Sequence, residues 1–217
     1  MTTIQNAVVP LLLAALLPAG LAAQSKPAKP KVPAVALATA GLAGQSVAVL
    51  PLTMLISDPR VPGTSGAAAR TTVLRWADSL LGDLLAERAP EVTWVLPPSL
   101  RSTARRAAGL LPGPDQMGQS VMRSPNLKEV PDPLRGYLRQ LLGLAGGARY
   151  ALIPASLVLS PSGASGDSLE VQLSAVLADG RLGRVVWRTL AVGRGETADQ
   201  AYRGALATLF PPESGAP

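Results

Sequence analysis

The stretch QSVAVLPLTMLISDP, residues 45–59, is a nearly continuous apolar run with polar residues at both ends. Neighbouring side chains of a strand point to opposite faces, so an unbroken apolar run predicts a strand that is covered on both sides. Val49 and Leu50 are therefore both expected in the core. Residues 56–69 continue with many Pro, Gly and Ser residues and predict a long loop.

The middle of the chain has the 3.6-residue spacing of amphipathic helices. Residues 70–88 predict the first helix, and the β-rich residues 91–98 predict a short strand after it. A second helix is predicted from a Ser99 cap to about Leu110. A third is predicted to begin at Asp132–Pro133, with the acid as the cap and the proline in the first turn. Three acidic residues are expected on the solvent side of the first helix: Asp78, Asp83 and Glu87.

The last third of the chain changes from helical spacing to strands. Residues 148–160, 168–179 and 183–193 are rich in Val, Leu and Ala, and Gly- and Asp-containing turns separate them. Such turns are typical of antiparallel hairpins. A closing helix is predicted over residues 197–209, with Thr197 as its cap.

This order of elements predicts an α/β fold with one mixed sheet of about five strands and about four helices covering it. The early strands are separated by helices, which favours parallel pairing, whereas the late strands form antiparallel hairpins. We expect a single domain over residues 45–212 and a disordered tail over 213–217.

The first forty-four residues predict an export signal and a tether. Residues 1–23 contain an apolar core of about eleven residues, a Pro-Ala-Gly break and small residues, which is typical of a signal peptide cleaved near Ala23. An uncleaved anchor over residues 4–23 is the alternative. Residues 24–44 are rich in Pro, Lys and Ala and predict an extended tether. Its three lysines either contact an acidic cell-wall polymer or belong to a leader without specific contacts: Lys26, Lys29 and Lys31.

Composition removes the commonest catalytic groups. The 217 residues contain neither Cys nor His, which excludes thiolate nucleophiles, Ser-His-Asp triads and nearly all transition-metal sites. The formal net charge is +6, of which the tether lysines supply three, so a nucleic-acid partner is not expected. We predict a periplasmic or otherwise exported protein with no transmembrane span in its mature form.

Few residues suggest a site, and each has a structural alternative. An Arg cluster on the second helix could bind an anion or a partner, and Trp187 could mark a partner surface. The residues GRGET, 193–197, could hold an anion at a helix start, although a turn is the simpler interpretation. No catalytic, cofactor or metal residue is predicted. The candidate contacts are Arg101, Arg105, Arg106 and Trp187.

Several segments together resemble a known family. VAVLPL at 47–52, ADSLLGDLLAER at 77–88 and VTWVLPPS at 92–99 are similar to the opening of the TolB amino-terminal domain and its relatives CsgG, FlgO and LpoB. GARYALIPASLVL and LEVQLSAVLADGRLGRVVW resemble that family's second half. The resemblance implies envelope accessory or assembly work through binding. This chain departs from it in having no cysteine for a lipid anchor.

We therefore expect a non-enzymatic envelope module that engages another envelope protein or assembly. The alternative is a hydrolase that acts on an envelope polymer through Asp, Glu or Ser residues. The long segments 56–69 and 111–131 are the expected contact surfaces. Deletion of residues 113–129 is expected to leave the fold intact.

Overall fold

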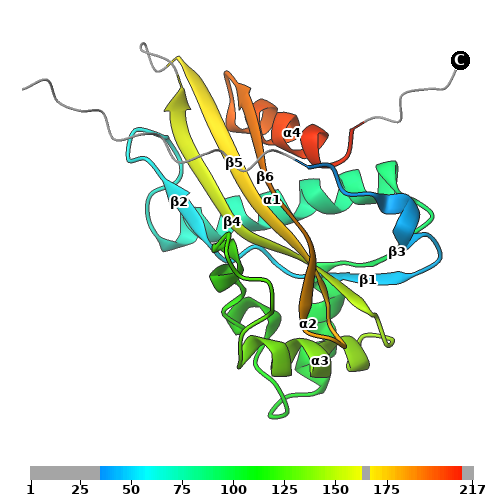
Figure 1. Ribbon diagram of the computed structural model, residues 1–217. Coiled ribbons are helices and arrows are strands. Elements are labelled where there is room, and N and C mark those ends of the chain that lie inside the picture. Colours follow the sequence, from blue (N-terminus) through cyan, green and yellow to red (C-terminus); the bar gives the residue numbers. More distant parts are fainter. Residues whose placement is uncertain (1–34, 163–166, 212–217) are drawn as a thin grey trace, which may run out of the picture. The chain divides into compact units, whose positions relative to one another are not determined.

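The computed structural model describes residues 35–162 and 167–211 (Figure 1). These residues form one mixed sheet of six strands and four α-helices, which confirms the predicted fold class. Several expectations lie outside the described residues: the signal peptide, the tether lysines, the tail over 213–217 and the tip of the hairpin at 163–166. The strands are β1 (Ser46–Val49), β2 (Leu55–Ser57), β3 (Thr93–Val95), β4 (Tyr150–Ser162), β5 (Ser168–Asp179) and β6 (Arg184–Gly195).

The sheet combines parallel and antiparallel pairing as expected. Its order is β3-β1-β4-β5-β6, and β2 pairs with the far half of β4. Strand β1 pairs in parallel with β3 and β4, and β2 pairs in parallel with β4. Strands β4, β5 and β6 form two long antiparallel hairpins. Parallel pairing of β1 with β3 and β4 follows from the helical segments that separate these strands in the sequence.

The apolar run at 45–59 forms two strands, not the single strand that its composition predicts. Leu50 still donates its amide to the Leu152 carbonyl, but Pro51 has no amide hydrogen, and the Leu52 amide donates to the Asp78 carboxylate. Pairing with β4 resumes at Leu55. A proline and one side-chain acceptor thus interrupt the strand, while Val49 and Leu50 are both buried as predicted.

Two hydrophobic cores lie on opposite faces of the sheet. Helices α1 and α4 cover one face, and α2, α3 and the segment before α3 cover part of the other (Figure 1). Val49 belongs to the first core and Leu50 to the second, as alternation along a strand requires. The helices are α1 (Ala67–Arg88), α2 (Pro97–Arg106), α3 (Leu134–Leu144) and α4 (Ala198–Leu209). Within the described residues, no helix has the combined length and apolarity needed to cross a bilayer.

Three predictions about helix ends have different outcomes. Thr197 caps α4 as expected, because its hydroxyl accepts a hydrogen bond from the Gln200 amide at 3.2 Å. Helix α2 instead begins at Pro97, and Ser99 lies inside its first turn. At α3, Pro133 occupies the N-cap position, and no side chain caps the helix. Prolines thus mark both of these helix starts without a polar cap.

The folded part of the chain begins before Gln45. Leu37 and Leu42 are buried in the first core, and a short 3-10 helix, η1 (Thr39–Leu42), lies within residues that the sequence assigns to the tether. The Leu37 amide donates to the Leu209 carbonyl, which fixes this segment to the end of α4. The apolar residues of the segment, rather than its Pro and Ala content, decide where packing begins.

The segment 111–131 is part of the second core. It forms two 3-10 helices, η2 (Pro114–Gln116) and η3 (Gln119–Arg123), and it buries Met117, Met122 and Val130. Gln119 is fully buried and donates to the Pro51 and Pro114 carbonyls. The structure therefore contradicts the expectation that residues 113–129 can be deleted without damage to the fold.

Candidate functional site

One face of the sheet is covered over only half of its length. Along β4, β5 and β6 the side chains that face α1 and α4 are buried, for example Leu157, Leu173 and Ala191. On the opposite face, the side chains at the end of β4, the start of β5 and the end of β6 are only half-buried. Ile56 of β2, beside them, is 41% exposed. We call this surface the open face. Its half-buried residues are Val158, Ser160, Glu170, Gln172, Leu190 and Val192.

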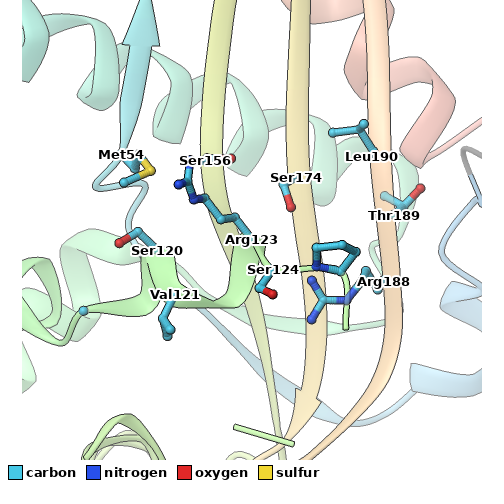
Figure 2. A pocket seen from close by; sticks show the side chains of 12 residues that line it. Met54, Ser120, Val121, Arg123, Ser124, Ser156, Ser174, Arg188, Thr189 and Leu190 are labelled. Atoms are coloured by element: carbon cyan, nitrogen blue, oxygen red, sulfur yellow. The ribbon is translucent and has the colours of Figure 1, made fainter. Parts of the chain in front are cut away.

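A pocket of about 760 Å³ lies where the open face meets η3. Figure 2 shows its two sides: strands β4, β5 and β6 form the floor, and η3 with the residues after it forms one wall. Ser156, Ser174 and Leu190 form one row across the three strands, because they are partners in the sheet register. We call this pocket the serine–arginine pocket, after its serines and arginines: Ser120, Ser124, Ser156, Ser174, Arg123 and Arg188.

Two of these serines are almost fully buried in the floor. Ser156 is 5% exposed and Ser174 is 8% exposed. Neither hydroxyl makes a hydrogen bond to another described residue, but both oxygens are accessible from the pocket, since the described side-chain atoms that are fully buried without a hydrogen-bond partner are Arg88 Nε and Gln119 Oε1. The neighbouring positions of both strands are apolar. The floor of the pocket therefore presents two adjacent hydroxyl groups that are free to bind a ligand.

Arg188 of β6 places a half-buried guanidinium group at the edge of the pocket (Figure 2). Its Nη1 donates to the Met122 carbonyl, and its Nη2 donates to the Leu127 carbonyl at 3.0 Å. Among the described residues no carboxylate pairs with it. Burial lowers the pKa of the Arg188 guanidinium from its ordinary value, because a charge that is removed from water is destabilised.

A second cation approaches the same floor from η3. Arg123 is exposed, and Figure 2 shows its side chain extending from η3 toward β4. No described residue forms a hydrogen bond or ion pair with its guanidinium group. The pocket is thus lined by hydroxyl and guanidinium groups, and its described lining contains no Asp, Glu, Lys or Tyr. This arrangement can bind and orient a polar ligand, but it offers no general base.

A buried ionic network involves Asp78 and Arg101. The sequence places Asp78 on the solvent side of its helix, but its side chain is only 7% exposed. Its Oδ1 accepts from the Leu52 amide at 2.8 Å, and its Oδ2 lies 3.3 Å from Arg101 Nη2. Arg101 also binds Asp115 at 2.7 Å. Asp78 is turned into the core because its carboxylate accepts the Leu52 amide between β1 and β2.

Burial raises the pKa of Asp78 to about 6 from its ordinary value of 3.8. The Leu52 hydrogen bond and the Arg101 charge act in the opposite direction but do not offset the loss of water. Arg101 itself has a raised pKa, chiefly because it donates to Asp115. The guanidinium is therefore stabilised mainly by Asp115, and Asp78 is the weaker partner.

Stability is expected to depend on this carboxyl group. Between about pH 4 and pH 6 the folded state retains a proton that the unfolded chain releases, so the free energy of unfolding falls as pH rises through this window. The fall attributable to Asp78 is at most about 3 kcal/mol, from about 1.36 kcal/mol per pKa unit. Urea unfolding at a series of pH values should show this slope in the parent and a flatter profile in Asp78→Asn. Asp83→Asn, on the exposed side of α1, controls for the change in net charge. Equal slopes in the parent and Asp78→Asn would contradict the assignment.

The structure separates the residues of the predicted Arg cluster. Arg101 is held by Asp78 and Asp115, and Arg106 donates to the Ser102 and Thr103 hydroxyls. Arg105 is exposed, and within the described residues it has no ion-pair partner. The three therefore do not converge on one point, and their role as contacts stays a prediction.

Trp187 lies on the sheet face that α1 and α4 cover, where it packs against the first core. Its Nε1 donates to the Val35 and Ala36 carbonyls at 3.2 Å. The ring thus fixes the beginning of the folded segment. The residues GRGET form the end of β6 and the turn into α4, where the Thr197 hydroxyl already binds the helix amide.

The predicted contact loop at 56–69 borders a second pocket of about 580 Å³. This pocket is mainly apolar and lies between the loop, α1 and the start of α4. Its lining includes Val61, Trp76, Leu159 and Leu169. Among the described residues, no group of three or more acidic side chains is placed to hold a metal ion.

Sequence reasoning missed the residues of the serine–arginine pocket. Ser174 is expected on the more polar face of its strand, but Ser156 and Arg188 are surrounded by apolar residues and read as parts of buried strands. An arginine inside the apolar run VVWRTLAV was the available signal. Only the tertiary structure, which brings η3 over the strands, shows that the three share a pocket.

The geometry defines the class of protein: an α/β domain whose mixed sheet is half-covered on one face and carries a polar pocket there. No protein-family model and no curated protein sequence matches the chain. Several solved structures are similar to it at low identity. The LpoB C-terminal domain from Salmonella enterica is 18% identical over 69% of this chain and 82% of that chain, with a TM-score of 0.36.

Two further structures have comparable scores. Lipoprotein GNA1162 from Neisseria meningitidis is 19% identical over 75% of this chain and 90% of that chain, with a TM-score of 0.38. The hypothetical protein CT253 from Chlamydia trachomatis is 10% identical over 77% of this chain and 92% of that chain, with a TM-score of 0.42. LpoB is one of the relatives that the sequence resembles.

Proposed function

We propose that this protein is an exported, non-enzymatic binding module that engages another protein or assembly of the cell envelope through the open face. The observation that carries the proposal is the half-covered sheet itself. The described helices do not cover the open face at the end of β4, the start of β5 and the end of β6. A sheet face that presents Ile56, Leu190 and Val192 to solvent is typical of an interaction surface.

The mixture of side chains on this face favours a protein partner. Apolar and charged residues lie side by side on it. Glu170 pairs with Arg194 at 2.7 Å, next to Val192. Apolar area provides affinity, and flanking charges orient the partner. The apolar leader of residues 1–23 supports an envelope location, and the Pro- and Lys-rich residues after it are suited to a spacer.

The alternative function is hydrolysis of an envelope polymer through Asp, Glu or Ser residues, and two convergent carboxylates would support it. Asp78 and Asp115 do converge, but both bind the Arg101 guanidinium that lies between them. A carboxylate held in this way is not free to approach a glycosidic or ester bond. The binding module is therefore the better-supported function. Turnover of a peptidoglycan or ester substrate that is lost in Asp78→Asn or Asp115→Asn would favour the hydrolase.

Crosslinking capture from an envelope fraction tests the binding function. We expect the purified protein to capture the same partner repeatedly, and Ile56→Asp and Val121→Asp to reduce the yield at least tenfold. Leu144→Asp, at a comparably exposed apolar position of α3, is the matched control and should capture normally. Equal capture by all three variants would contradict a role for the open face.

A further inference from the structure

The floor of the serine–arginine pocket contains polar groups that the fold does not use. Ser156 and Ser174 are more than nine-tenths buried and are direct partners across β4 and β5. Their hydroxyls make no hydrogen bond to any described residue, yet each can both donate and accept. Both oxygens open onto the pocket, because neither is among the described side-chain atoms that are fully buried without a hydrogen-bond partner. Two adjacent hydroxyls that the fold leaves unused are therefore available to a ligand.

The charge at the pocket edge indicates which kind of ligand. Arg188 uses one N–H of Nη1 and one of Nη2 for carbonyls of the 122–127 segment. A guanidinium group has five N–H donors, so about three remain. Buried charges in proteins are usually paired, but among the described residues Arg188 has no carboxylate partner. Arg123 of η3 adds a second guanidinium to the lining, and no described residue pairs with it.

We propose that the serine–arginine pocket binds an oxyanion, namely a carboxylate or phosphate group of the ligand. The oxygens of the anion accept hydrogen bonds from the Ser156 and Ser174 hydroxyls and from free N–H groups of Arg188. Arg123 closes over the anion from η3. The proposal rests on the proposed binding function and adds the chemical group that the binding partner presents.

The two guanidinium groups suit an anion better than a neutral ligand, and the serine hydroxyls can donate to it as well. Guanidinium groups only donate hydrogen bonds, and they bind carboxylates and phosphates with paired parallel bonds. The described lining contains no acidic side chain that would repel the ligand. The competing explanation is that Arg188 only fastens the 122–127 segment to β6. That role accounts for two N–H groups of Arg188, but not for the two serines or Arg123.

Titration of the isotopically labelled protein by NMR tests the proposal. The probes are N-acetyl-alanyl-alanine, which has a free carboxylate, its C-terminal amide, and glycerol phosphate. We expect saturable shifts of the Ser156, Ser174 and Arg188 signals with at least one anion and none with the neutral amide. Saturation by the peptide alone identifies a chain-terminal carboxylate as the ligand group, and saturation by glycerol phosphate alone identifies a phosphate.

Variants separate binding from a structural role. Ser156→Ala with Ser174→Ala removes two hydroxyls that bond to no described residue, so stability should change little while anion affinity falls about tenfold or more. Arg123→Met should weaken binding at least severalfold without affecting the Arg188 contacts. Arg188→Met should abolish binding, and Arg188→Lys should restore the charge but little of the affinity. Arg105→Met, on α2, is the control and should bind as the parent does.

Two results would overturn the proposal. The first is the absence of saturation by either anion at millimolar concentrations. The second is binding that the serine and Arg123 substitutions leave unchanged. Envelope capture distinguishes this failure from failure of the function. Normal capture without anion binding would rule out only the oxyanion site. Anion binding without capture would rule out the proposed envelope partner.

Discussion

Replacing Gly193 with alanine is expected to destabilise the domain by about 3 kcal/mol or more, toward the upper end of overpacking substitutions. A Cβ atom at this position would lie 2.1 Å from the Ala201 carbonyl oxygen and 2.2 Å from the Ala205 nitrogen. Both atoms belong to the backbone of α4, so no side chain can rotate away. The helix must separate from β6, and the first core must open with it. The free energy of unfolding from urea denaturation measures the effect.

Gly204 supplies the matched control from the other side of the same contact. A Cβ there would meet Gly193 Cα at 3.5 Å, which is an ordinary van der Waals distance. Alanine also favours the interior of a helix by up to about 1 kcal/mol over glycine. Gly204→Ala should therefore be neutral or stabilising. Equal stability of the two variants would show that α4 does not pack on β6 in this way.

Replacing Val49 or Leu50 with aspartate is expected to cost about 4 kcal/mol or more each, because either change buries a charge without a partner. The two residues are neighbours in the sequence but belong to different cores. Each variant therefore tests a different face of β1. Thermal unfolding followed by circular dichroism is a suitable measurement.

Ile56→Asp is the control for these two substitutions. Ile56 is also an apolar strand residue, but it is 41% exposed on the open face. The added carboxylate stays in contact with water, so a loss below about 1 kcal/mol is expected. A loss in Ile56→Asp as large as in Val49→Asp would mean that the open face is covered. Unchanged stability of Val49→Asp or Leu50→Asp would contradict the central position of β1.

The sequence predicted most of the helices and strands and the parallel or antiparallel character of their pairing, but not the break between β1 and β2. Alternation along residues 168–179, helical spacing along 70–88 and Gly-Asp turns are local signals, and they predicted the hairpins and helices. It failed where a tertiary contact decides the outcome. Asp78 is buried because the amide of Leu52, 26 positions away, has no strand partner. The 111–131 segment is irregular by composition, yet Gln119 and Met122 fasten it into the core.

The candidate site was less predictable than the fold. Charged residues such as Arg101 attract attention in the sequence, but the structure pairs Arg101 with acids. Ser156, Ser174 and Arg188 come from different strands, and their spacing in the sequence carries no periodic signal. What makes them a candidate site is that the two hydroxyls have no partner among the described residues and that Arg188 has no carboxylate partner there. This is a property of the folded chain alone.

The central claim is that the protein works by binding through the open face. Site-specific photocrosslinking in the intact envelope tests it most directly. A photoreactive residue is placed at Ile56, at Val121 beside the pocket, or at Leu144 on α3, which have comparable exposure. We predict one crosslinked partner common to Ile56 and Val121 and none at Leu144. No adduct at Ile56 or Val121, or the same adduct at all three positions, would contradict the claim.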